Sequence, residues 1–424
     1  MESNGVTTPN FIDSYLHYIR DTESPITFHR WSIMSCLGAF LGKRFYIRHG
    51  HSRINSNMYV MLMGVAGTRK STAIKVASKI LKKAGYDNFS ASKTSKEQFL
   101  ADLAKTGMGD STDTDEILDM NLWGSDADST MGSCEILINA DEFNDFVGNG
   151  NIEFLSLLGN LWDIDGDYKH SKLTAKSVFV KDPCVSILAG NTATGFSLAF
   201  PKEAIGQGIF SRLLLIHGDP TGKKIAFPKP PSEEATAALI TCLQQIRSIC
   251  NGEATLSDGA KHLLERCYHE WTPINDVRFE SYSNRRFTHL LKLSLICAAA
   301  HKMVEILPRH VVLANTILVH AEHSMSRALG EFGSAAKSDV NNKVVQLLSA
   351  AKAPLTYKDI WKHVSTDLHQ LSDLRPIIEN LTFADKIIKA GQGFLLKRKL
   401  VEELSQSDLV DFSLLTESER SYIT

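Results

Sequence analysis

Short apolar runs alternate with segments of helical periodicity over the first half of the chain. The apolar runs have the length and composition of buried strands, and they lie at residues 59–63, 134–140, 183–190 and 213–216. Before and between them, apolar side chains recur with the spacing of a buried helix face, most clearly at residues 11–41, 73–81 and 154–162. The alternation predicts an α/β core over residues 51–230 that follows a helical N-terminal segment at residues 1–50.

The pattern changes beyond a proline-rich stretch at residues 227–231. Residues 231–335 have helical periodicity almost throughout, and we expect a helical lid domain there. Residues 336–400 have the element order of a winged helix, with three helical segments and two short strands around Gly391. This segment is mildly basic, and such domains bind either duplex DNA or partner proteins. Residues 401–424 are acidic with scattered leucines, and we expect a mobile tail or a docking peptide.

One segment inside the core has a different composition. Residues 105–133 are rich in Gly, Asp, Ser and Thr. Their aspartates could ligate a metal ion, but the spacing fits no EF-hand loop. We therefore expect a flexible and solvated acidic insertion.

The overall composition narrows the possible partners and the cellular location. A net charge of −2 over 424 residues excludes a uniformly basic surface, so any contact with nucleic acid must come from a local patch. The seven cysteines have no C-x-x-C spacing and mostly lie inside apolar runs, which indicates reduced core residues and argues against a zinc site. The sequence has no evident signal peptide or membrane-spanning stretch. We expect a soluble protein of the cytoplasm.

The apolar run at residues 59–63 leads into a glycine-bearing turn, and Lys-Ser-Thr then opens a helix. This arrangement is typical of a phosphate-binding cradle for ATP, formed here by Gly64, Val65, Ala66, Gly67, Thr68, Arg69, Lys70, Ser71 and Thr72. Backbone N–H groups would face the phosphates, Lys70 would reach the β and γ oxygens, and the Ser71 hydroxyl would ligate Mg²⁺. Arg69 departs from the usual G-x-x-x-x-G-K-[ST] pattern, because it stands where that pattern has glycine. The alternative is a tight strand-to-helix turn that carries a surface lysine.

Polar residues at three other strand ends suit the same chemistry. Asp141 and Glu142 end one apolar run, where Asp141 would hold Mg²⁺ and Glu142 would polarise the attacking water. Asn191 ends the next run and would orient that water or contact the γ-phosphate, although a simple Asx turn is the alternative. Arg212 lies between a helix end and a buried strand, where a cation needs an anionic partner. In a ring, that anion would be the nucleotide of the neighbouring subunit.

A basic hairpin is the candidate nucleic-acid contact. Residues 167–181 have strand-like flanks and a polar centre, which predicts a β-hairpin with a basic tip. Its candidate DNA-binding residues are Lys169, His170, Lys172 and Lys176. The alternative is an ordinary solvated hairpin.

In their order along the chain, these motifs resemble the AAA+ class of P-loop ATPases, in particular the MCM proteins and the superfamily 3 viral helicases. The matching residues are Gly64, Lys70 and Ser71 (Walker A), Asp141 and Glu142 (Walker B), Asn191 (sensor 1) and Arg212 (arginine finger). The Gly-Ile-Phe-Ser-Arg-Leu-Leu setting of Arg212 is similar to the G-x-x-S-R-F run of MCM proteins, although Leu213 replaces the aromatic residue. The resemblance implies a parallel sheet flanked by helices. It also implies that the 167–181 hairpin lines the pore of a ring and carries a lysine to the single strand.

The layout also resembles the primase-helicase-like ATPases of phages and plasmids, over roughly residues 10–330, although no primase motif or zinc ribbon is present. These resemblances imply an ATP- and Mg²⁺-dependent DNA helicase or translocase that forms a homo-oligomeric ring, expected to be a hexamer. It would act in the replication of a phage or other mobile element, in the cytoplasm of a host cell. The implied partners are further copies of the chain, single-stranded DNA, and replication proteins that bind the winged helix or the acidic tail.

Two other functions stay open at this point. A P-loop ATPase that loads a helicase or remodels a protein partner would hydrolyse ATP without responding to single-stranded DNA. A nucleic-acid-binding scaffold with an inactive nucleotide site would show no turnover, and Arg69 would mark the loss of the site. The presence of Asp141, Glu142 and Arg212 argues against the scaffold.

Overall fold

The computed structural model describes residues 10–421 except for 108–131, 173–174, 202–207, 229, 275, 331–339, 341–342, 346, 349–350, 352, 366–367, 369, 384–386 and 397–406. The chain divides into two compact units. The first comprises Met1–Gly330 and Asp408–Thr424, and the second comprises Glu331–Ser407. Most of the acidic insertion expected at residues 105–133 lies outside the described residues.

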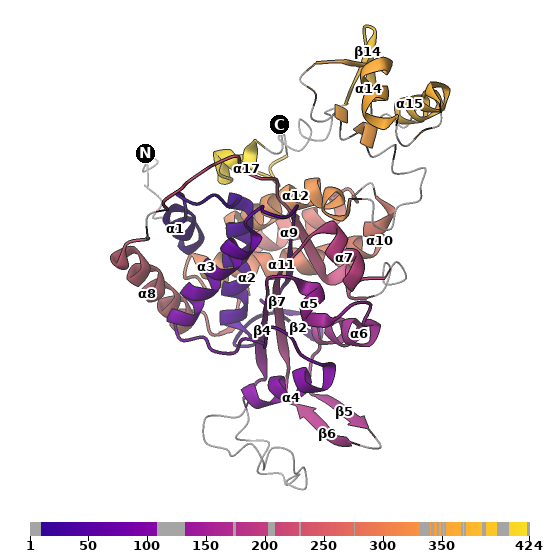
Figure 1. Ribbon diagram of the computed structural model, residues 1–424. Helices are drawn as coiled ribbons and strands as arrows, with labels where there is room; N and C mark the ends of the chain where they lie inside the picture. The colour runs from indigo at the N-terminus through magenta and orange to yellow at the C-terminus, as the bar shows by residue number, and fades with distance from the viewer. Residues whose placement is uncertain are drawn as a thin grey trace, which may run out of the picture. The chain divides into compact units, whose positions relative to one another are not determined.

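Four parallel strands form the centre of the first unit, in the order β4-β7-β3-β8 (Figure 1). These strands are β3 (Tyr59–Met63), β4 (Glu135–Ala140), β7 (Cys184–Asn191) and β8 (Leu213–His217). Their carboxyl ends share one edge of the sheet, because Met63 pairs with Asn191 on one side and with His217 on the other. Every residue of β3 and β7 is buried, as in central strands covered on both faces. The predicted α/β class, with a parallel sheet flanked by helices, is confirmed.

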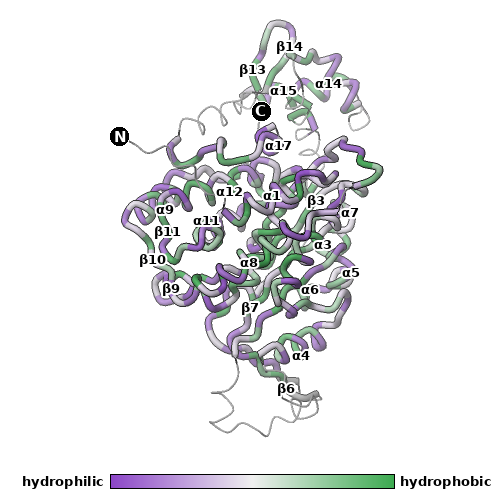
Figure 2. Tube along the Cα trace, turned by 90° about the vertical axis from the view of Figure 1, so that its left-hand side faces the viewer, coloured by the Kyte–Doolittle hydropathy of each residue, from purple (hydrophilic) through white to green (hydrophobic). Residues whose placement is uncertain are grey.

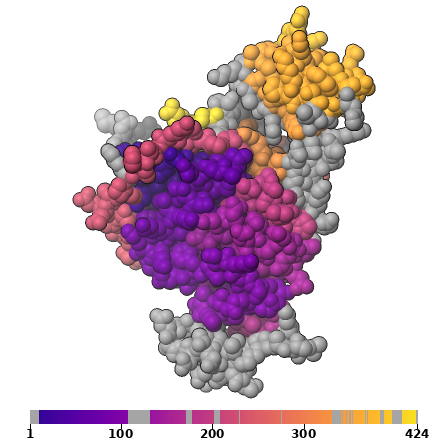
Figure 3. All heavy atoms as spheres, viewed as in Figure 1, coloured from indigo at the N-terminus to yellow at the C-terminus, as the bar shows by residue number. Residues whose placement is uncertain are grey.

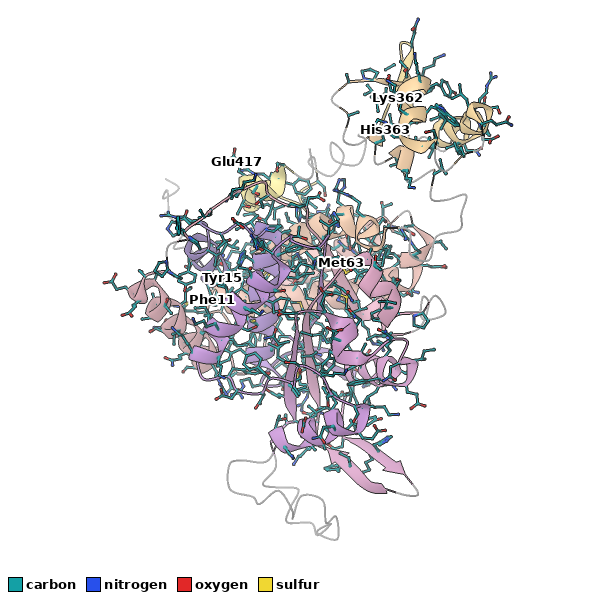
Figure 4. The ribbon with its side chains drawn as sticks, in the orientation of Figure 1. Phe11, Tyr15, Met63, Lys362, His363 and Glu417 are labelled. Carbon is teal, nitrogen blue, oxygen red and sulfur yellow. The ribbon has the colours of Figure 1, made fainter. Side chains whose placement is uncertain are left out.

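Helix α2 (Ile26–Leu41) lies in the core and not in a separate N-terminal segment. It contacts all four strands of the sheet, and the helices that pack against it include α1 (Phe11–Tyr18), α3 (Lys70–Lys83) and α8 (Glu233–Ile249). All its residues from Thr27 to Leu41 are buried, because apolar side chains surround the helix instead of forming one stripe. Helix α1 packs against α2, and its side chains Phe11 and Tyr15 are buried (Figure 4).

Shorter helices lie on the other side of the sheet in Figure 1. They are α5 (Phe143–Val147), α6 (Ile152–Leu161) and α7 (Ala193–Ala199), and each contacts β7. Helix α4 (Lys96–Thr106) contacts β4. In Figure 2 the apolar stretches gather around the strands in the interior of the first unit. None of the helices that the structure describes is both long and apolar enough to cross a bilayer.

The helices expected to form a lid domain belong to the same unit as the sheet. After α8 come α9 (Asp258–Glu270), α10 (Glu280–Ser283), α11 (Arg286–Ala300) and α12 (Pro308–Leu329). Helix α12 packs against β8, α9 and α11, and α11 contacts α2. Their helical character agrees with the sequence pattern, but their packing makes them part of the main core. Small strands complete this unit: β1 (Phe45–His49), β2 (Ser52–Asn55), β9 (Gly252–Glu253), β10 (Thr255–Leu256) and β11 (Glu305–Ile306).

The C-terminal segment returns to the first unit and packs there, so the expectation of a mobile or partner-docking tail is wrong for residues 408–421. It contains the 3₁₀ helix η6 (Phe412–Leu414) and α17 (Glu417–Arg420). Its Glu419 carboxylate accepts hydrogen bonds of 2.6 and 2.7 Å from Arg30 of α2. Both side chains are at most 2% exposed, so this pair is a core contact.

The predicted hairpin is present as β5 (Tyr168–Lys172) and β6 (Ala175–Val180), which pair antiparallel. It comes directly before β7, which begins at Cys184 and ends at Asn191. The hairpin therefore lies at the amino end of β7, at the opposite edge of the sheet from the turn that follows β3 (Figure 1).

The second unit has a small apolar core of its own. Its elements are β12 (Leu355–Thr356), α14 (Tyr357–Val364), the 3₁₀ helix η5 (Leu371–Asp373), α15 (Leu374–Phe383), β13 (Ile387–Ala390) and β14 (Gly393–Leu396). The strands form an antiparallel sheet in the order β12-β14-β13, and Gly391 turns the last hairpin with φ of 62°. The helix expected at residues 340–350 lies partly outside the described residues.

Candidate functional site

The turn between β3 and α3 is tight and has a left-handed backbone at two positions, Gly67 with φ of 86° and Arg69 with φ of 62°. Glycine adopts this conformation freely, whereas a side chain such as that of Arg69 raises the energy by about 1 kcal/mol. A Cβ on Gly64 would lie 2.8 Å from the carbonyl oxygen of Gly218, so the start of the turn has no room for a side chain. The Thr68 hydroxyl closes the turn by donating to the Val65 carbonyl.

Lys70 lies inside this turn. Its Nζ donates to the carbonyl oxygens of Gly64 at 2.8 Å and Val65 at 3.2 Å, and the residue is only 6% exposed. Burial lowers the pKa of Lys70, while the charge of Glu142 acts in the opposite direction. Lys70 is therefore not the surface lysine of the alternative interpretation, because its ammonium group is held where the turn carbonyls converge.

The two carboxylates after β4 have different surroundings. Asp141 forms an exposed ion pair of 2.6 Å with Lys75, which lies one helical turn beyond Ser71 on α3. Glu142 is half-buried, and burial raises its pKa while the charge of Lys70 lowers it. Glu142 is thus the carboxylate that is electrostatically coupled to Lys70, whereas Asp141 contacts Lys75 of α3, the helix that also carries Ser71.

These residues fit a magnesium nucleotide. Ser71 is half-buried in the first turn of α3, where backbone N–H groups have no partner within the helix. The Ser71 hydroxyl and the Asp141 carboxylate are the kind of oxygen ligands that Mg²⁺ prefers. Among the described residues, no group of three or more His, Cys, Asp or Glu side chains could hold a metal ion. A magnesium ion bound here would therefore need ligands other than Ser71 and Asp141, and the phosphates of the nucleotide would supply them.

Asn191 ends β7 between the Lys70 turn and the Asp141–Glu142 corner. It is fully buried, and its Oδ1 accepts a 2.9 Å bond from the N–H of the next residue, Thr192, whereas an Asx turn would bond the N–H two residues on. Its Nδ2 has no hydrogen-bond partner among the described residues, and the same is true of Asn144 Oδ1 and His217 Nδ1. Unpartnered buried polar atoms are rare in native proteins, and a bound water, ion or ligand can supply the missing partner. All these residues lie at or directly after the carboxyl edge of the sheet.

Sequence reasoning missed a charged group beside the turn. His217 ends β8, and its Nε2 lies 3.2 Å from Asp219, whose other carboxylate oxygen accepts a 2.7 Å bond from Arg327 of α12. Burial, followed by the charge of Arg327, lowers the pKa of His217. The polar end of an apolar strand could have indicated His217, but nothing in the sequence pattern connects it with Arg327.

Arg212 lies at the other edge of the sheet. It ends the 3₁₀ helix η3 (Phe210–Arg212) and directly precedes β8, whose five residues span about 16 Å. Its guanidinium donates to the Gly208 carbonyl at 2.6 Å and to Asp163 at 3.2 Å. Arg285 binds the second oxygen of Asp163 at 2.5 Å. The anion that Arg212 needs is therefore supplied in this structure by its own chain.

The hairpin residues are only partly described. Lys169 is exposed, and its Nζ lies 5.7 Å from the centre of the Phe179 ring on the paired strand. His170 is half-buried. Lys172 and Lys176 belong to β5 and β6, and their side chains lie outside the described part of the structure.

No protein-family model matches the chain, and no protein of curated function matches it significantly.

Proposed function

We propose that the chain is an ATP- and Mg²⁺-dependent DNA helicase or translocase with an AAA+-like P-loop core, and that it works as a homo-oligomeric ring. One observation carries the proposal: adjacent parallel strands bring Lys70, Asn191 and the Asp141–Glu142 corner to one edge of the sheet. Ligands of parallel α/β sheets bind at this carboxyl edge.

Each residue at the edge has a role in ATP hydrolysis under this proposal. Lys70 binds the β- and γ-phosphates, and the backbone N–H groups of residues 64–72 surround them. Ser71 and Asp141 would hold Mg²⁺, and the ion would supply positive charge beside the phosphates. Glu142, whose pKa is raised by burial, accepts a proton from the attacking water. The unpartnered Nδ2 of Asn191 donates to the γ-phosphate or to that water.

The position of Arg212 supports a nucleotide site shared between subunits. Arg212 and the turn lie at opposite ends of parallel strands, so Arg212 cannot reach the phosphates bound by its own Lys70. In the proposed ring, Arg212 would therefore act on the nucleotide of a neighbouring copy, where it would stabilise the charge of the transition state. Assembly would then exchange the Asp163 carboxylate for the phosphate.

The hairpin and the second unit supply the contacts with DNA and partners. The β5–β6 hairpin is joined directly to β7, so a shift of Asn191 on hydrolysis reaches the hairpin through one strand. We assign a winged helix to the second unit, in which Lys362 and His363 of α14 are exposed (Figure 4). We place the protein in the cytoplasm of a host cell that replicates a phage or other mobile element.

A second candidate function, a helicase loader or protein-remodelling ATPase, is favoured by one feature of the second unit. The exposed charges that the structure describes on α15 are Arg375 and Glu379, which pair with each other at 3.2 Å. A helix with no net charge on its exposed face suits a protein partner better than the phosphates of duplex DNA.

Steady-state ATP hydrolysis with and without single-stranded DNA tests the proposal. We expect DNA to stimulate turnover, and Lys70→Ala to lower it by roughly a hundredfold, because a charged group that binds the transition state is lost. Turnover that ignores DNA would support the loader. Absence of turnover in the wild-type protein, with DNA binding retained, would support the scaffold.

A further inference from the structure

The residue that breaks the phosphate-loop pattern has a side-chain partner of its own. Arg69 Nε and Nη2 lie 2.8 and 2.7 Å from Oε2 of Glu23, in the segment between α1 and α2. The Arg69 side chain is 56% exposed, so the guanidinium stays accessible from solvent. Its backbone has the left-handed conformation that glycine would adopt without strain. Strained backbone at a ligand-binding turn is commonly linked to function.

Glu23 forms hydrogen bonds that link its own segment to the turn at Arg69 and to the segment after β8. Its Oε1 accepts a 2.8 Å bond from the Ile225 N–H, and its carbonyl accepts a 2.7 Å bond from the Thr221 hydroxyl. The hydroxyl of the next residue, Ser24, donates to the Arg69 carbonyl at 3.1 Å. On the face seen in Figure 3, the segment after β8 lies beside the indigo-coloured residues near the start of the chain. The Ile225 N–H and, after it, Arg69 lower the pKa of Glu23, so the carboxylate is charged at neutral pH.

We propose that Arg69 is a phosphate-binding side chain of the nucleotide site, and that Glu23 competes with the nucleotide phosphates for it. The inference rests on the proposed function, because it assumes that a nucleotide binds at Lys70. Arg69 directly precedes Lys70, whose ammonium group marks the place of the phosphates. A guanidinium binds phosphate oxygens as well as it binds a carboxylate, by paired charge-assisted hydrogen bonds.

The replacement of the Glu23 carboxylate by a nucleotide phosphate as the partner of Arg69 has a low energetic cost. Exposed ion pairs are weak, and the Arg69–Glu23 pair is exposed on the arginine side. A triphosphate presents more negative charge than one carboxylate, so it attracts the guanidinium more strongly when bound nearby. Because the two anions compete for one cation, nucleotide binding weakens the ion pair between Glu23 and Arg69 of the turn.

A double-mutant cycle on nucleotide affinity tests the inference. The ligand is a non-hydrolysable ATP analogue with Mg²⁺, and binding is measured by calorimetry. We expect Glu23→Gln to tighten binding by about two- to fivefold, the range of an exposed ion pair. Arg69→Gly should weaken it by roughly tenfold, although glycine relaxes the backbone, because a charge-assisted phosphate contact is lost. The double variant should bind like Arg69→Gly, since Glu23 then has nothing to compete for.

Glu253→Gln is the matched control, because Glu253 forms a comparable exposed pair with Arg48 at 3.3 Å. We expect it to leave the affinity unchanged. If Arg69→Gly binds as tightly as the wild type or more tightly, or if Glu23→Gln does not tighten binding, the inference is overturned while the proposed function stands. If the wild-type protein binds no nucleotide, both fail. Circular dichroism of each variant verifies that the variant is folded.

Discussion

At the scale of single residues, several charged groups are held in the core by partners far away in the sequence. Arg30 pairs with Glu419, and Arg286 of α11 pairs with Glu322 of α12 at 2.8 Å. Lys292 is buried with no carboxylate paired to it among the described residues, and it donates to Asn57 Oδ1 at 2.6 Å. Its pKa falls to about 7, chiefly because of burial. Such groups stabilise only the arrangement that supplies their partner, because a buried charge that loses its partner is strongly destabilising.

The Arg30–Glu419 pair gives a stability prediction. Glu419→Gln leaves the Arg30 charge buried without a counter-charge, so we expect the free energy of unfolding to fall by roughly 3 kcal/mol. Urea denaturation measures the difference. The exposed Glu253→Gln variant serves as the control and should change stability by no more than about 0.5 kcal/mol. An equal, small effect of both substitutions would show that the Arg30–Glu419 ion pair adds little to the stability of the first unit.

The same pair predicts a pH dependence. Burial alone would raise the pKa of Glu419, but the charge and hydrogen bonds of Arg30 outweigh it and lower the pKa to about 2 from an ordinary value of 4.5. Between these values the unfolded chain binds the proton more tightly, so the stabilisation is complete above about pH 4.5 and is lost as the pH falls towards 2. The stability difference between wild type and Glu419→Gln should therefore shrink below about pH 4.5. A difference that is constant with pH would contradict the ion pair.

At the scale of elements, the proposed ATP-binding residues lie at the carboxyl ends of the parallel strands, whereas the hairpin and Arg212 lie at the amino ends. The carboxyl ends of β3, β4 and β7 lead to Lys70, Asp141 with Glu142, and Asn191. The amino ends of β7 and β8 follow the hairpin and Arg212. A strand is stiff and fully hydrogen-bonded, so a displacement at one end is transmitted to the other.

The hairpin gives the prediction at this scale. We expect Lys172→Ala and Lys176→Ala each to lower the affinity for single-stranded DNA. Each should also reduce the slope of log K against log salt by about 0.7, because one fewer phosphate is neutralised. Fluorescence anisotropy at several salt concentrations measures both quantities. Lys261→Ala, which removes an exposed lysine of α9, is the matched control. Equal effects of the control and the hairpin variants would exclude the hairpin as the DNA contact.

At the scale of the whole molecule, the proposed site is incomplete in one chain. Lys70 and Arg212 lie at opposite edges of one sheet, and Arg212 is occupied by Asp163. Assembly of identical copies brings the two edges together if each copy presents its Arg212 edge to the next copy's turn. Such a head-to-tail contact generates a ring when the rotation from one copy to the next closes, and the proposal requires this closure.

Mixing two inactive variants tests this arrangement. Lys70→Ala and Arg212→Ala should each lose most ATP hydrolysis when alone. In an equimolar mixture, about a quarter of the interfaces in a head-to-tail ring combine an intact Lys70 with an intact Arg212, so part of the activity should return. Sedimentation of the mixture verifies that rings form. Mixed rings that stay inactive would mean that the site is not shared between subunits.

Much of the local structure could be predicted from the sequence, because it depends on neighbouring residues. The apolar run of β3 and the glycines that follow it predict a buried strand and a tight turn. The hairpin at residues 167–181 and the elements of the second unit follow from the same local patterns. The residues proposed to bind ATP were found in this way, since strand ends concentrate polar side chains.

Only the tertiary structure decided where those elements and charges lie. Helix α2 was expected in a separate segment, yet it crosses the whole sheet, and the expected tail places Glu419 beside Arg30. Nothing local to Arg69 or Arg212 indicates that Glu23 and Asp163 are their partners. Sequence periodicity reports which side of an element is apolar, but the identity of the surface that covers it depends on the packing of the whole chain. Partners separated by tens or hundreds of residues are chosen by that packing alone.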